Sequence, residues 1–255
     1  MRHMLYPAPG LAVGPPPEGF EEVWIEAAEL GRTHGWLRRM RSPPERSAVL
    51  FFHGNGENLE SLRRDGTIDR LAALDAVVLV VDYPGYGRSA GTPSEESLVT
   101  AGIAAFDRLG ELAPDRPRVV CGWSLGAATA AQVAAARPEA VAGLVLMSPW
   151  SRLADVARRH FPPLLVRFLL AERWDSTAAV ARYRGAALVL HGARDEIIPV
   201  EQGREVAAGL PGARWVELPR AGHNDLLAHD EPWRELAGFL RGAAILAIPQ
   251  ENPRS

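Results

Sequence analysis

The chain has 255 residues, of which 47% are hydrophobic and 23% charged, and these proportions are typical of a soluble globular protein. All 28 basic residues are arginine, and 31 acidic residues leave a net charge of −3, so nothing favours nucleic-acid binding. The single cysteine, Cys121, excludes an internal disulfide framework, and neither a membrane span nor a secretory signal is evident. We therefore expect a cytoplasmic protein.

Eight strands are expected along the chain. The first two are short and form an antiparallel hairpin around Gly31. The later ones, except for the last, are continuous apolar runs, which is typical of strands that are buried on both faces of a sheet. The expected strands cover residues 23–25, 35–37, 48–52, 76–81, 119–121, 143–147, 187–190 and 214–218.

Helical patterns separate most of these strands. One of them opens at Ser94 and carries Glu95 and Glu96 in its first turn, where acidic side chains favour the helix dipole. The expected helices cover residues 59–74, 94–112, 125–137, 200–210 and 231–240. This alternation predicts an α/β fold with a mostly parallel eight-stranded sheet, helices on both faces, and one domain over residues 1–255.

Residues 150–185 interrupt the alternation with an arginine-, leucine- and proline-rich stretch that is mainly helical in pattern. Its middle, residues 161–170, is apolar on nearly every helical face, and such a helix must bury more than one side. We expect a small cap inserted into the domain. A substrate chain, a second copy of the chain in a homodimer, or a membrane surface could cover its other side.

The strongest motif lies at residues 122–126, where Gly122, Ser124 and Gly126 form G-x-S-x-G between an apolar strand and an alanine-rich helix. A serine at the tip of such a turn adopts a strained backbone conformation, so bulky flanking side chains would collide. The helix N-terminus behind the serine offers free N–H groups where an oxyanion would develop. An ordinary turn that happens to hold a serine is the simpler alternative, and the strand and helix on either side argue against it.

A serine hydroxyl needs a base, and the base needs a carboxylate to orient it. His223 is the best base candidate because it lies in a loop after the last strand, next to Gly222. Asp195 directly follows a buried strand and is the favoured carboxylate. Glu196 is a minor alternative, and Asp225 is poorly placed because it is only two residues from His223. The chain order Ser, Asp, His is that of the α/β-hydrolases.

The sequence resembles the α/β-hydrolase superfamily, and within it the branch of small serine hydrolases that includes protein depalmitoylases and their bacterial and fungal relatives. The resemblance covers roughly residues 18–228 and lies in FFHGNGEN, DYPGYGRSAGTPSE, GWSLG, SPW, RWDS, HGARDEIIPVEQG and AGHNDL. The N-terminal cysteine cluster that eukaryotic depalmitoylases carry has no counterpart in this sequence.

The resemblance implies that Ser124 is the nucleophile, Asp195 the acid and His223 the base. It also implies an oxyanion hole made by the backbone N–H groups of Leu125 and Asn55. Further candidates for contact with the substrate are His53, Tyr83, Tyr86, Trp123, Trp150, Leu165 and Phe168. For the two tyrosines, packing beneath a loop is the alternative role. For His53, and likewise for His191, the alternative is a structural role in which the side chain bonds loop backbone.

No zinc, nucleotide or P-loop motif is present, so we expect neither a metal nor a cofactor. The sequence therefore predicts a cofactor-independent serine hydrolase that cleaves small-molecule esters or thioesters through an acyl-enzyme. A peptidase is the second possibility, and a catalytically silent binding protein on the same fold is the third.

Overall fold

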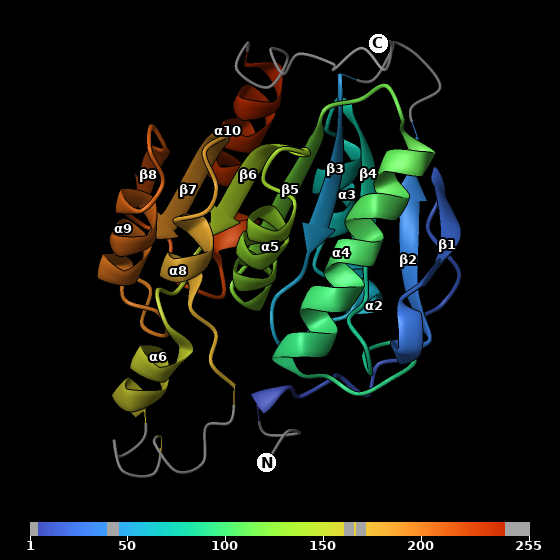
Figure 1. Cartoon of the computed structure of the whole chain (residues 1–255), viewed down its shortest axis with the longest axis horizontal. Coiled ribbons are helices and arrows are strands. Elements are labelled where there is room, and N and C mark those ends of the chain that lie inside the picture. The colour runs from blue at the N-terminus through green and yellow to red at the C-terminus, as the bar shows by residue number, and fades with distance from the viewer. Residues whose placement is uncertain (1–4, 40–45, 161–165, 167–171, 243–255) are drawn as a thin grey trace, which may run out of the picture.

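A computed structural model describes residues 5–39, 46–160, 166 and 172–242. Its eight strands form one sheet, as predicted (Figure 1). The strands are β1 (Phe20–Glu26), β2 (Arg32–Arg38), β3 (Ser47–Phe52), β4 (Ala76–Val81), β5 (Arg118–Trp123), β6 (Val141–Met147), β7 (Ala186–Gly192) and β8 (Arg214–Leu218).

The sheet has the order β1-β2-β4-β3-β5-β6-β7-β8. The β1–β2 hairpin is antiparallel, and β2 also runs antiparallel to β4, whereas every pair from β4 to β8 is parallel. In the middle of the sheet Val49 is in register with Val78 on one side and Val119 on the other. The continuous apolar runs are therefore the central strands, which helices cover on both sides.

Helices lie on both faces of the sheet (Figure 1). The α-helices are α2 (Leu59–Arg64), α3 (Thr67–Ala72), α4 (Glu95–Leu112), α5 (Leu125–Ala136), α6 (Leu153–His160), α8 (Ser176–Val180), α9 (Val200–Ala208) and α10 (Asp230–Arg241), and the short 3₁₀ helices are η1 (Ala28–Leu30) and η2 (Leu226–Ala228).

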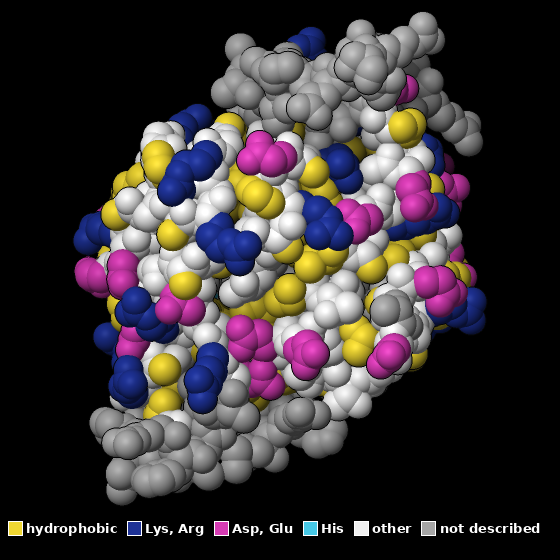
Figure 2. All heavy atoms as spheres, in the orientation of Figure 1, with side chains coloured by type: hydrophobic (Ala, Val, Ile, Leu, Met, Phe, Trp, Pro, Cys, Tyr) yellow, Lys and Arg dark blue, Asp and Glu magenta, His cyan; other side chains and the backbone are white. Residues whose placement is uncertain are grey.

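Two apolar cores lie on the two faces of the sheet. On one face α4, α5, α8 and α9 pack against the strands, with Phe106 and Val180 among the buried side chains. On the other face α2, α3 and α10 do so, with Leu71 and Leu236 in that core. Cys121 of β5 is fully buried in the second core, as its place in an apolar strand predicted. Figure 2 shows side chains of both charges interspersed over the first face, in keeping with the small net charge.

The expected single helix over residues 59–74 is wrong, because the structure divides it into α2 and α3. Gly66 stands between them at φ +85°, a left-handed conformation that interrupts an α-helix and that glycine adopts without a steric penalty. The Asp65 side chain accepts a hydrogen bond from the Thr67 N–H at 2.9 Å and so helps to start α3. The apolar spacing continues across this break, which is why periodicity alone did not reveal it.

The carboxyl ends of the parallel strands face the edge of the molecule where α6 and the beginning of the chain lie (Figure 1). Within residues 150–185, the structure describes α6 and α8, and the Leu153 N–H donates to the Trp174 carbonyl oxygen at 3.0 Å. Leu165 and Phe168 lie outside the described residues. None of the described helices is long and apolar enough to cross a membrane.

Candidate active site

Ser124 stands at the tip of a sharp turn between β5 and α5. Its backbone has φ +56° and ψ −114°, a strained conformation for a residue other than glycine. A Cβ on Gly122 would lie 2.0 Å from the Gly126 carbonyl oxygen, and a Cβ on Gly126 would lie 2.0 Å from that of Phe52. Both glycines are thus sterically required, as the motif predicted.

Ser124, His223 and Asp195 form one chain of polar contacts, although 99 residues separate the first two. His223 Nε2 lies 3.0 Å from Ser124 Oγ, and His223 Nδ1 lies 2.7 Å from Asp195 Oδ2. All three residues are less than a tenth exposed. The arrangement allows a proton to pass from the serine to the imidazole while the carboxylate holds the ring.

Asp195 is held as a carboxylate by the loop after β7. Its Oδ1 accepts the N–H groups of Ile197 at 3.0 Å and Ile198 at 2.7 Å. Burial raises the pKa of Asp195, but hydrogen bonds from His191 and His223 oppose this effect, and the Ile198 N–H adds to them. The net result is a pKa well below the usual range, so Asp195 stays ionised wherever His223 can act as a base.

His191 supports this carboxylate from below. Its Nε2 lies 2.9 Å from the Ile198 carbonyl oxygen and 3.3 Å from Asp195 Oδ2. The ring is fully buried, and a Cβ on Gly203 would lie 2.3 Å from its Nδ1. The structure therefore places His191 in the structural role, bonded to loop backbone, that was the alternative to contact with the substrate.

The two competing carboxylates lie elsewhere. Glu196 is exposed. Asp225 instead accepts the Gly222 N–H at 2.6 Å through Oδ1, and its Oδ2 lies 3.5 Å from His229 Nε2. Asp225 thus shapes the loop that carries His223 and is not the carboxylate that contacts the His223 imidazole.

The two expected oxyanion donors flank the serine. Leu125 is the first residue of α5, where the N–H has no acceptor within the helix. Asn55 lies in the turn after β3; its Nδ2 donates to the Leu5 carbonyl oxygen at 2.8 Å, and its Oδ1 accepts the Tyr86 hydroxyl at 2.9 Å. Both residues line the same cavity as Ser124.

His53, Tyr83 and Tyr86 do not line that cavity. The His53 and Tyr83 rings are 4.3 Å apart, and the Tyr83 hydroxyl donates to the His53 carbonyl oxygen at 2.6 Å. All three side chains are buried. They pack beneath the turn that carries Asn55, and so hold it in position instead of forming a wall of the site.

The cavity at Ser124 has a volume of about 260 Å³ and is mainly apolar. Trp123 and Trp150, for which the sequence predicts contact with the substrate, line it. The other lining residues, apart from Ser124, His223 and the oxyanion donors, are Leu5, Tyr6, Leu153, Val156, Trp174, Ile197, Ile198 and Asn224. Trp123 also lies against the base, because its ring centroid is 5.3 Å from that of His223.

Tyr6 and Trp174 are functional candidates that sequence reasoning missed. Tyr6 belongs to a segment without regular periodicity, yet its side chain is only 2% exposed, and its hydroxyl accepts the Trp174 indole N–H at 2.9 Å. Trp174 belongs to the RWDS motif, and this membership was the only signal in the sequence that pointed to it.

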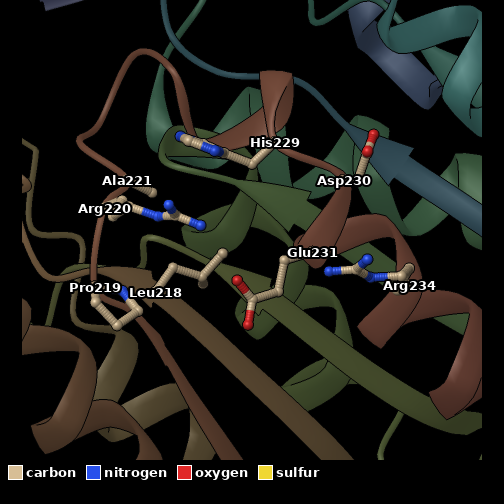
Figure 3. Close-up of a pocket in the computed structure, with 8 residues that line it drawn as sticks. All are labelled: Leu218, Pro219, Arg220, Ala221, His229, Asp230, Glu231 and Arg234. Atoms are coloured by element: carbon tan, nitrogen blue, oxygen red, sulfur yellow. The ribbon is translucent and has the colours of Figure 1, made fainter.

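A second, more polar cavity of about 350 Å³ lies between residues 218–221, which precede His223, and the beginning of α10 (Figure 3). Its side chains include Arg220, His229, Glu231 and Arg234, and in Figure 3 the Glu231 carboxylate lies between the two guanidinium groups. Neither Ser124 nor His223 lines it. The chemistry of the site therefore belongs to the smaller cavity.

The sheet order, the helices on both faces and the turn at Ser124 define the α/β-hydrolase fold. The solved structure of the Pyrococcus furiosus esterase Pf2001 matches it with a TM-score of 0.73, covering 92% of this chain and 98% of that one at 20% identity.

The family model described as serine aminopeptidase, S33, matches residues 43–176, which is just over half of the chain. The chain therefore belongs to this family of α/β-hydrolases, and it is a hydrolase. The Mycobacterium tuberculosis protein Rv2307c is 37% identical over 80% of this chain and 72% of its own length. The Arabidopsis thaliana protein WAV2 is 28% identical over 87% of this chain and 78% of its own length.

Proposed function

We propose that the protein is a serine hydrolase that cleaves carboxylic esters or thioesters with small acyl groups. The observation that carries this proposal is the unbroken chain from Ser124 Oγ through His223 to Asp195, which opens into an apolar cavity. A nucleophile that lines a cavity, with a positioned base and a buried orienting carboxylate, is the arrangement that acyl transfer requires.

In the proposed reaction Ser124 Oγ attacks the acyl carbonyl carbon, and its proton passes to His223 Nε2. The N–H groups of Leu125 and Asn55 stabilise the oxyanion. The intermediate collapses as His223 returns this proton to the leaving alcohol or thiol. Water, deprotonated by His223, then attacks the acyl-enzyme, and the carboxylic acid is released as Ser124 regains its proton. Asp195 stabilises the imidazolium in both acylation and deacylation.

The cavity favours a small, uncharged acyl group. Its volume of about 260 Å³ lies just below the range of about 300–1,000 Å³ that is usual for drug-sized ligands. Trp123, Trp150 and Trp174 supply much of its apolar wall. The structural neighbour from Pyrococcus furiosus is an esterase, which agrees with this substrate class.

An aminopeptidase would instead need an acidic anchor for the free amino group of its substrate. No aspartate or glutamate is among the described residues that line the Ser124 cavity. This observation favours esters over peptides with a free N-terminus. A panel of p-nitrophenyl esters, an acyl thioester and aminoacyl amides, assayed with the purified protein, separates the two classes directly.

We also propose that residues 1–255 form one domain, with residues 150–185 as its cap. Leu153 and Val156 of α6 line the cavity, which supports contact with the acyl group over the other roles considered for this segment. Pairing of two chains through the cap would appear in light scattering as a doubled mass.

The test of the nucleophile is Ser124→Ala. It should abolish labelling by a fluorophosphonate probe and lower kcat on the order of 10⁶-fold, as loss of the nucleophile does in a serine protease. Ser148→Ala is the matched control, because Ser148 is buried at the end of the neighbouring strand and its Oγ has no hydrogen-bond partner among the described residues. Labelling that persists in Ser124→Ala, or its absence from the wild type, would contradict the proposed function.

A further inference from the structure

The turn that carries Asn55 is held by two side chains that meet at Gly54. The Gly54 N–H donates to Glu57 Oε2 at 2.8 Å. A Cβ on Gly54 would lie 2.4 Å from Trp123 Cζ3, so the indole ring packs directly against this glycine. Gly54, the residue before Asn55, is therefore held at its N–H by a carboxyl group and at its Cα by the aromatic residue that precedes the nucleophile.

Glu57 carries a half-buried carboxyl group. The proposed reaction makes no direct use of this group. Burial is the largest influence on it and raises the pKa of Glu57 to about 7. The charge of His53 and the Gly54 N–H lower the pKa, whereas Asp65 at the end of α2 raises it. Trp123, which packs on the same glycine from β5, is uncharged.

We propose that Glu57 is a positioning residue, which holds the backbone at Gly54 and through it that of Asn55, so that the Asn55 N–H meets the oxyanion best when the Glu57 carboxyl is ionised. This inference rests on the proposed function, because it concerns the same oxyanion. It assigns a second ionisable group to the reaction, in addition to the base His223.

The physical reason is the strength of one hydrogen bond. A carboxylate accepts an N–H bond about twice as strongly as a neutral group does. When Glu57 takes up a proton, its bond from Gly54 weakens, and the neighbouring Asn55 N–H is held less firmly. A donor that is not held in place stabilises the transition state less, and such a loss falls on kcat and leaves KM nearly unchanged.

Two variants test the proposal. Glu57→Gln keeps an oxygen that accepts the Gly54 N–H but does not titrate, whereas Glu57→Leu removes the acceptor. Glu139→Gln is the matched control, because Glu139 is exposed and lies before β6. The measurements are kcat and KM for one p-nitrophenyl ester from about pH 5 to 9.

For the wild type and Glu139→Gln, the acid limb of the kcat profile should contain a second ionisation around pH 7, that of Glu57, in addition to that of the base. Glu57→Gln presents a neutral acceptor, as the protonated carboxyl does, so at pH 8.5 its kcat should be lower than that of the wild type and its acid limb should contain a single proton. Glu57→Leu should lose about 10- to 100-fold in kcat at pH 8.5, part of the 10²- to 10³-fold that loss of a whole oxyanion donor costs.

Thermal unfolding adds a readout that does not depend on turnover. A carboxyl whose pKa is raised on folding stabilises the fold at low pH, and this contribution is lost as the pH rises through about 7. The Tm of Glu57→Gln relative to the wild type should therefore increase between pH 5 and pH 8.5.

A two-proton acid limb that persists in Glu57→Gln would overturn the proposal, and so would wild-type kcat in a folded Glu57→Leu. If either outcome occurs while fluorophosphonate still labels Ser124, only the role of Glu57 is rejected and the proposed function stands. Absence of labelling in the wild type would reject the proposed function instead.

Discussion

At the scale of single residues, the site depends on one strained serine and its two glycine neighbours. A positive φ at a residue other than glycine costs about 1–3 kcal/mol, and the surrounding structure must impose it. Here the Ser124 N–H donates to the Met147 carbonyl oxygen at 2.9 Å, and Gly122 and Gly126 leave room for the turn. The strain exposes Ser124 Oγ to both the base and the cavity.

Asp195→Asn should keep the fold and lower kcat by about 10⁴-fold, the loss known for the same change in a serine protease triad. The physical reason is that an amide presents an N–H or a weaker acceptor to His223 Nδ1, and the imidazole then takes the wrong tautomer. Steady-state kinetics measure the effect. Glu196→Gln is the control and should stay near wild type, because Glu196 is exposed. The opposite ranking would mean that the carboxylate has been assigned wrongly.

At the scale of elements, the residues of the site come from separate helices and loops that meet at the carboxyl ends of the strands. The elbow comes from β5 and α5, the carboxylate follows β7, and the base follows β8. The α6 helix adds an apolar wall through Leu153 and Val156, which are three residues apart and so share one helical face. The sheet holds Ser124, Asp195 and His223 together, and α6 limits the size of the cavity beside them.

Val156→Trp should shorten the longest acyl chain that the enzyme accepts. The larger side chain fills part of the cavity, and each methylene that no longer fits forfeits up to about 0.8 kcal/mol of burial. The measurement is kcat/KM for p-nitrophenyl esters of increasing chain length, in which turnover of the shortest ester should survive.

Ala157→Trp is the control for this change, because Ala157 is on the same helix and does not line the cavity. An identical chain-length profile in folded Val156→Trp would remove α6 from substrate selection.

At the scale of the whole molecule, residues near the beginning of the chain contact the site. Leu5 and Leu11 accept hydrogen bonds from the side chains of Asn55 and Asn58, at 2.8 and 2.7 Å. Tyr6 and Trp174 meet across 168 residues of sequence. Since burial raises the pKa of Tyr6 well above its usual range, the hydroxyl remains neutral at every pH of interest.

Tyr6→Phe should lower the free energy of unfolding by about 1–3 kcal/mol, because the buried indole N–H of Trp174 loses its acceptor. Urea unfolding measures this change. Trp174→Phe combined with Tyr6→Phe should cost less than the sum of the single changes, since the pair shares one interaction. Strict additivity would show that the hydrogen bond contributes nothing to stability.

The sequence by itself determined the sheet, the elbow and the three polar residues at the strand ends. These features are local: a continuous apolar run such as residues 76–81 predicts a buried strand whatever packs on it. Gly122 likewise reports a steric requirement within one turn, whereas the requirement at Gly126 comes from Phe52 on the neighbouring strand β3. Chain order then assigned Asp195 and His223, because parallel strands bring their carboxyl ends to one edge.

Only the tertiary structure decided what surrounds those residues. The Tyr6–Trp174 contact, the packing of His53 beneath a turn and the elevated pKa of Glu57 all depend on neighbours that come from other parts of the chain. The burial of a side chain and the charges around it depend on all of these neighbours together, so no local sequence pattern predicts them. A local pattern predicts strands, helices and turns, whereas the shape and charge of a site follow from the packing of the whole fold.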